Sequence, residues 1–109
     1  MSHLNLSTAI INKDNYEEEL FNLLDCLDAD FTGTNGPEYT GEELINKGFD
    51  SHLDYSIHRA CQEKNNLKDI INSVLDDATN YWSNFYDNTE KSIIDMDNQL
   101  LVSVAVSRD

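Results

Sequence analysis

The apolar residues between positions 67 and 86 recur with a period of 3.6, and this feature constrains the fold most. Only a helix brings residues at that spacing to one side of the chain. The stretch "LKDIINSVLDDATNYWSNFY" keeps the period for about five turns, and Asn66 is placed to cap its start. We therefore expect a long amphipathic helix with Trp82 and Phe85 in the core. Its apolar face comprises Leu67, Ile70, Ile71, Val74, Leu75, Ala78, Tyr81, Trp82 and Phe85.

An earlier helix is predicted for residues 14–29, "DNYEEELFNLLDCLDA". Leu20, Leu23 and Leu24 fall in one apolar stripe of this segment. Asp14 and Glu17 have the spacing of a capping pair, so we expect the helix to begin there.

Two more helical segments are predicted in the middle of the chain. Thr40 and Glu43 match a capping box, and Gly48 stands where a glycine commonly ends a helix. The segment 50–64, "DSHLDYSIHRACQEK", restarts the helical spacing, with Ser51 as the expected cap. In this segment Leu53, Ile57, Ala60 and Cys61 share the face that we expect to join the core.

The last part of the chain has the composition of β-strands. In "KSIIDMDNQLLVSVAVS", Asp97 and Asn98 suit a tight turn between two strands. The N-terminal "HLNLSTAI" alternates weakly and is a candidate third strand. We expect one domain, residues 1–109, of the α+β class. It would be a mainly helical body of three to four helices with a small antiparallel β-sheet, formed by the C-terminal hairpin and the candidate N-terminal strand.

The segment "LLVSVAV" also bears on assembly, because an uncharged strand left at a sheet edge pairs readily with another chain. Two alternatives remain open. The N-terminal segment covers this strand, or two copies pair through it and form a homodimer.

Charge restricts the function more than any motif does. The 109 residues include 21 Asp and Glu against 7 Lys and Arg, a net charge of −14. Nucleic acid and anionic membranes would repel such a chain, so we expect a basic protein partner instead. The N-terminal residues resemble no secretory signal, and only two cysteines occur. These features predict a cytoplasmic protein with reduced thiols.

The stretch "DADFTGTNGPEY", residues 28–39, begins like a calcium-binding loop. Asp28, Asp30 and Thr32 occupy the first three ligand positions of an EF-hand, and Gly33 occupies its glycine position. The twelfth position, however, is Tyr39 in place of the bidentate Glu. We therefore interpret the stretch as an ordinary connection rich in glycine and proline.

Metal binding and catalysis find little support in the sequence. Asp54, His58 and Cys61 share one helix face, but the outer two lie about 10 Å apart along a straight helix. We expect Cys61 to be part of the core, and Cys26 flanks an apolar stripe with nothing to activate its thiol. The sequence thus predicts no metal, no cofactor and no enzymatic activity.

The spacing of the acids suggests what they are for. Carboxylates at positions i and i+3 or i+4 of a helix lie about 5–6 Å apart, similar to successive phosphates of a nucleic-acid strand. Acidic helices can therefore imitate that backbone. The candidate partner-binding residues are Glu17, Glu18, Asp25, Asp28, Glu42, Glu43, Asp50, Asp54, Asp69, Asp76 and Asp77.

In size, acidity and helical character the chain resembles the phage-encoded decoys of the antirestriction and anti-CRISPR classes, a likeness of composition only. It implies an inhibitor that mimics nucleic acid and blocks a basic nucleic-acid-binding protein or nuclease complex, in the host cytoplasm if a phage encodes it. One alternative is an immunity protein or antitoxin against a basic nuclease, with Tyr39 and Tyr55 as anchors near Asp50 and Asp54. The other is an acidic adaptor domain whose charge confers solubility.

Overall fold

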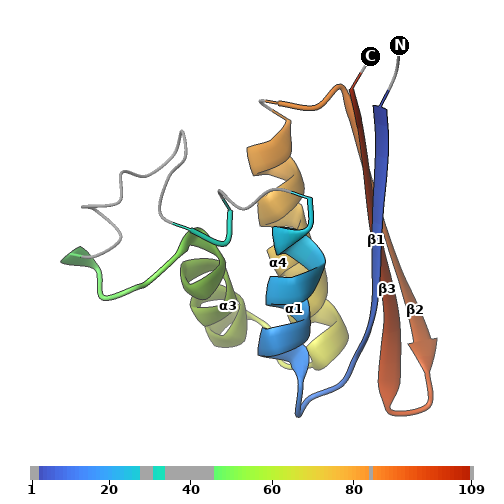
Figure 1. Cartoon of the computed structure of the whole chain (residues 1–109). Coiled ribbons are helices and arrows are strands. Elements are labelled where there is room, and N and C mark those ends of the chain that lie inside the picture. Colours follow the sequence, from blue (N-terminus) through green and yellow to red (C-terminus); the bar gives the residue numbers. More distant parts are fainter. Residues whose placement is uncertain (1–2, 28–30, 34–45, 84, 109) are drawn as a thin grey trace.

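A computed structural model describes residues 3–27, 31–33, 46–83 and 85–108 of the chain. Within these residues, three helices and three strands form an α+β fold (Figure 1), as the sequence predicts. The elements are β1 (His3–Ile11), α1 (Tyr16–Asp25), α3 (His52–Glu63), α4 (Leu67–Trp82), β2 (Asn88–Met96) and β3 (Gln99–Arg108).

The three strands form an antiparallel sheet in the order β1-β3-β2. The register places Ile10 and Ile94 on either side of Leu101, and it pairs His3 with Arg108, so β1 begins beside the end of β3 (Figure 1). The segment "LLVSVAV" is thus the central strand, bonded on one side to β1 and on the other to β2. The N-terminal segment forms a strand and covers "LLVSVAV" on one side, as the first alternative predicts, and β2 pairs with its other side, so the described structure leaves no open edge of "LLVSVAV" for a second copy.

The helices lie on one side of the sheet (Figure 1). Helix α1 packs along β1, α4 packs along β2, and α3 packs against α4 farther from the sheet. Burial alternates along β3, with Val102, Val104 and Val106 buried and facing the helices. The described helices and their acidic residues therefore lie on one side of the sheet, and no described helix lies on its other side.

The core contains Trp82 but excludes Phe85, whose side chain is 38% exposed. The prediction for Phe85 is wrong because α4 ends at Trp82, where the chain turns and the Phe85 N–H donates to the Trp82 carbonyl. Tyr81 is buried, and the hydroxyl of the half-buried Tyr86 donates to the carbonyl of Leu27.

Of the four predicted helix caps, three lie in the described residues, and two of these agree with the structure. The side chains of Ser51 and Asn66 accept hydrogen bonds from the backbone of Asp54 and Asp69, as predicted. The predicted Asp14–Glu17 pair is wrong, since α1 has Asn15 as its N-cap and no side-chain cap. Here the backbone N–H of Asn12 donates to Asn15 Oδ1, and that of Asn15 to Asn12 Oδ1, at 2.8 and 3.1 Å.

Gly48 adopts the positive φ of 88° that a helix-ending glycine favours. The helix predicted from Thr40 lies outside the described residues, except for its last turn. So do most of the residues of "DADFTGTNGPEY", apart from Phe31, Thr32 and Gly33.

Candidate acidic interaction surface

Eight of the eleven predicted partner-binding residues are described; Asp28, Glu42 and Glu43 lie outside the described residues. Seven of the eight are exposed, and Asp77 is half-buried. They are Glu17, Glu18, Asp25, Asp50, Asp54, Asp69, Asp76 and Asp77.

Helix α1 carries acids at both of its ends. Glu17 and Glu18 lie in its first turn, where the positive end of the helix dipole stabilises negative charge. Asp25 lies in the last turn, where the dipole disfavours an acid and no basic residue is present. Its carboxylate accepts a 2.8 Å hydrogen bond from the Thr32 hydroxyl. We name Glu17, Glu18 and Asp25 the α1 acidic face.

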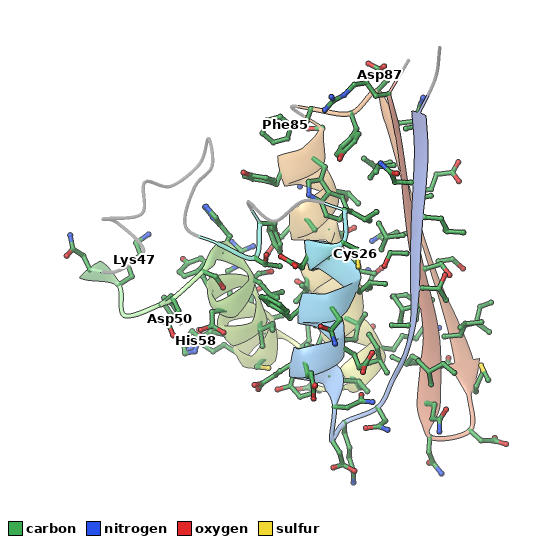
Figure 2. All side chains as sticks on the ribbon, viewed as in Figure 1. Cys26, Lys47, Asp50, His58, Phe85 and Asp87 are labelled. Carbon is green, nitrogen blue, oxygen red and sulfur yellow. The ribbon has the colours of Figure 1, made fainter. Side chains whose placement is uncertain are left out.

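Helix α3 presents Asp50 and Asp54 beside an aromatic pair. Asp54 lies in the first turn, and its backbone N–H donates to the Ser51 hydroxyl. Figure 2 shows Asp50 and His58 on the side of α3 that faces away from the sheet. The rings of Phe49 and Tyr55 meet edge to face at 5.0 Å in the same region.

Helix α4 directs two adjacent aspartates at different neighbours. Asp76 forms an ion pair with Lys91 of β2, whereas Asp77 contacts α3. A third acid, Asp69, lies in the first turn of α4, and its carboxylate accepts a hydrogen bond from the Asn66 side chain. The α4 acids therefore border the β2 edge or contact α3, while the α1 acidic face lies on the helix that packs along β1.

The structure thus distributes the predicted acids over three surfaces. Of the seven basic residues, Arg59, Lys68 and Lys91 form ion pairs, with Asp77, Asp95 and Asp76 respectively. Within the described part of the chain, the α1 acidic face has no ion pair. The same holds for Asp50, Asp54 and Asp69, but α1 is the one described helix that contains no Lys, Arg or His, so its charge is the least compensated.

The sequence already indicates that the charge of α1 is uncompensated, although helical spacing alone does not show it. No Lys, Arg or His occurs from residue 14 to residue 46, a segment that contains ten of the 21 acids. Helix α1 lies in this segment. The acids are Asp14, Glu17, Glu18, Glu19, Asp25, Asp28, Asp30, Glu38, Glu42 and Glu43.

Cys61 is exposed, so its predicted place in the core is wrong. Its neighbour Ala60 takes the buried position, and the Cys61 thiol lies 3.9 Å from the Tyr16 hydroxyl of α1. Burial and the hydrogen bond with Cys61 raise the pKa of Tyr16 to about 12. Among the described residues, no group of three or more His, Cys, Asp or Glu is arranged to hold a metal ion.

His52 is a buried residue that the sequence does not mark. Its ring stacks on the ring of Phe31 with 6.3 Å between the ring centroids, and its centroid lies 5.6 Å from that of the Tyr81 ring. The backbone N–H groups of His52 and Leu53 donate to the carbonyls of Gly33 and Phe31. This cluster packs the segment of residues 31–33, which follows α1, against the start of α3. Its role is therefore to position α3 relative to that segment.

An open groove of about 1000 Å³ lies in the described structure. Residues 12–14, 66–68 and 95–100 line it, where the hairpin approaches the starts of α1 and α4. The groove contains charges of both signs, and its Lys68 is bound to Asp95 at 3.1 Å. Its mixed charge gives it no evident preference for a basic or an acidic ligand.

Comparisons with protein families, with curated proteins and with solved structures find no match for this chain. In the part that the structure describes, no helix combines the length and the apolar character needed to cross a membrane.

Proposed function

We propose that the chain is a non-enzymatic inhibitor that occupies the groove where a basic protein binds DNA or RNA. The observation that carries the proposal is the uncompensated charge of the α1 acidic face. Lys and Arg residues that meet phosphates in such a groove would meet these carboxylates instead. Attraction between opposite charges would also make the encounter fast.

The geometry of α1 supports this use. Glu18 and Asp25 are seven residues apart and therefore lie on the same face, about 10 Å apart along the axis. Glu17 adds a third charge beside them, and a folded helix holds all three without ordering a flexible chain. Such preorganisation reduces the entropic cost of binding.

The proposed setting is the cytoplasm of a host cell, in the manner of a phage-encoded anti-restriction or anti-CRISPR decoy. Cys26 and Cys61 are both free and exposed, which fits a compartment that keeps thiols reduced. The partner is a basic nucleic-acid-binding protein or nuclease complex, and the proposal requires no cofactor or metal.

An immunity protein against a basic nuclease is the second candidate, and the surface of α3 favours it. Phe49 and Tyr55, whose rings form a pair, are the sequence neighbours of the exposed acids Asp50 and Asp54. Aromatic anchors with charged neighbours are typical of tight protein interfaces. In this case the contact would centre on α3, and the α1 acidic face would serve mainly to steer the encounter.

The experiment is capture of partners from a lysate of the natural host by the tagged chain, with and without excess DNA or RNA. The proposal predicts a nucleic-acid-binding protein that the competitor releases. A matched pair of variants locates the contact. Glu18→Lys with Asp25→Lys reverses the α1 acidic face, and Glu63→Lys with Asp97→Lys makes the same charge change at exposed positions elsewhere.

Capture that the competitor leaves intact would contradict binding at the nucleic-acid groove. Suppose that Tyr55→Ala then abolished capture of a nuclease, while Glu18→Lys with Asp25→Lys only slowed association. The immunity-protein hypothesis would then replace the decoy hypothesis.

A further inference from the structure

The sheet has an open face on the side away from the helices. Even-numbered residues of β2, the even-numbered residues Leu6 to Ile10 of β1, and the odd-numbered residues of β3 point to this side, opposite to the buried valines of β3. No described helix covers it (Figure 1), and side chains project from it in Figure 2. We name these residues the open sheet face.

This face concentrates the exposed apolar residues of the described chain. Leu6, Ile10, Ile94 and Met96 are 67%, 49%, 52% and 43% exposed, and of the six large exposed hydrophobic residues four lie here. Ile10, Leu101 and Ile94 form one row across the three strands. The four side chains expose on the order of 400 Å² together, an apolar area that on a soluble protein is often functional. Ile10, Ile94 and Met96 lie on one side of the central polar row of this face, and Leu6 lies on the other.

The same face is nearly without charge. Glu90 is its one charged residue, although 26% of the whole chain is charged. A polar row of Thr8, Ser103 and Ser92 crosses its centre, and the Thr8 and Ser103 hydroxyls are hydrogen-bonded at 3.2 Å. Hydroxyls can both donate and accept, so this row could pair with an identical row.

We propose that a second copy of this chain covers the open sheet face. Two chains of charge −14 repel one another over most of their surfaces, and the open sheet face carries only one of these charges, that of Glu90. Bringing two such faces together places the acidic helices on the two outer sides. Their charges would then be separated by two sheets, well beyond the screening length of about 8 Å in physiological salt.

The geometry of the dimer follows from ordinary sheet packing. Two three-stranded sheets stack face to face about 10 Å apart as a six-stranded sandwich with twofold symmetry. Covering most of both faces buries about 1,200 Å² in total, which is the lower end of the range for stable interfaces. We therefore expect a dissociation constant in the micromolar range.

The dimer does not rest on the proposed function, because the α1 acidic face stays exposed in it. Experiments can therefore contradict the dimer without contradicting the proposed function, and the reverse. Loss of self-association by a sheet variant would leave partner capture per chain in place, and reversal of α1 would leave the dimer in place.

Sedimentation velocity from about 1 to about 300 µM tests the dimer. The wild-type chain should pass from monomer to dimer over this range, and more salt should favour the dimer by screening repulsion. Ile10→Lys and Ile94→Lys should each weaken the dimer about 30-fold or more. Phe21→Lys, at an exposed residue of α1, makes the same charge change and should leave it intact.

Circular dichroism and the thermal midpoint establish that each variant is folded, which is expected because both isoleucines are about half exposed. A wild-type chain that stays monomeric at about 300 µM would overturn the proposal, and the occupant of the face would then be another molecule. A dimer that persists in both sheet variants would also overturn it, because the contact would then lie at a sheet edge or on the helices.

Discussion

The guanidinium of Arg59 lies 2.6 Å from the carboxylate of Asp77, and this ion pair joins α3 to α4. The hydroxyl of Ser56 donates to the same carboxylate oxygen, also at 2.6 Å. Burial is the largest single effect and would lower the pKa of Arg59, but the charge and hydrogen bond of Asp77, together with smaller contributions from Glu63 and Tyr55, raise the pKa overall. The guanidinium therefore remains charged, and Asp77 serves the packing of two helices.

Replacing Asp77 with alanine should lower the free energy of unfolding by about 1–3 kcal/mol, because it leaves the buried hydroxyl of Ser56 and the half-buried guanidinium of Arg59 without their acceptor. The neighbouring Asp76 is the matched control. Its carboxylate is more exposed than that of Asp77, 55% against 25%, so Asp76→Ala should cost less than about 1 kcal/mol. Urea unfolding at pH 7 measures both. Equal costs would show that the Asp77 cluster contributes no more than a surface pair.

The raised pKa of Tyr16 predicts how the stability of the fold depends on pH under alkaline conditions. The fold raises the pKa of its hydroxyl from 10.0 to about 12, so the folded state holds this proton more tightly than the unfolded state. The resulting stabilisation is fully present below about pH 10 and is lost as pH rises towards 12. Thermal midpoints across this range should fall less steeply for Tyr16→Phe than for the wild type. Parallel curves would contradict the shift.

Asn98 in the β2–β3 turn has a φ of 64°, a left-handed conformation that asparagine and glycine tolerate. Asn98→Ala should therefore destabilise the fold by about 1 kcal/mol, whereas Asn98→Gly should stay within about 0.5 kcal/mol of the wild type. Urea unfolding of the two variants side by side checks this. A glycine variant as unstable as the alanine variant would assign the effect to the lost side chain.

The elements of the fold follow from local patterns. The apolar period gives α4, Ser51 and Asn66 cap their helices, and the Asp97–Asn98 turn joins β2 to β3 as expected. Errors occur where tertiary contacts decide. The helical period continues through Phe85, yet the chain turns after Trp82, and at the end of α3 the core takes Ala60 and leaves Cys61 exposed.

The site is only partly readable from the sequence, for a similar reason. Helical phase correctly places Glu18 and Asp25 on an exposed face. Helical phase does not distinguish Asp76 from Asp77, because the basic partners that make them different come from β2 and α3. The open sheet face depends in turn on the strand order, which places Ile10 and Ile94 on either side of Leu101 in one row across the sheet.

The most direct test of the central claim is the affinity of a captured partner for three chains at about 50 and about 200 mM NaCl. The chains are the wild type, Glu18→Lys with Asp25→Lys, and Glu63→Lys with Asp97→Lys. If the α1 acidic face occupies a basic groove, its reversal should weaken binding about 100-fold and flatten the salt dependence, while the matched control changes affinity less than about fivefold. Equal losses in the two variants would contradict the claim, because binding would then follow net charge and not the α1 acidic face.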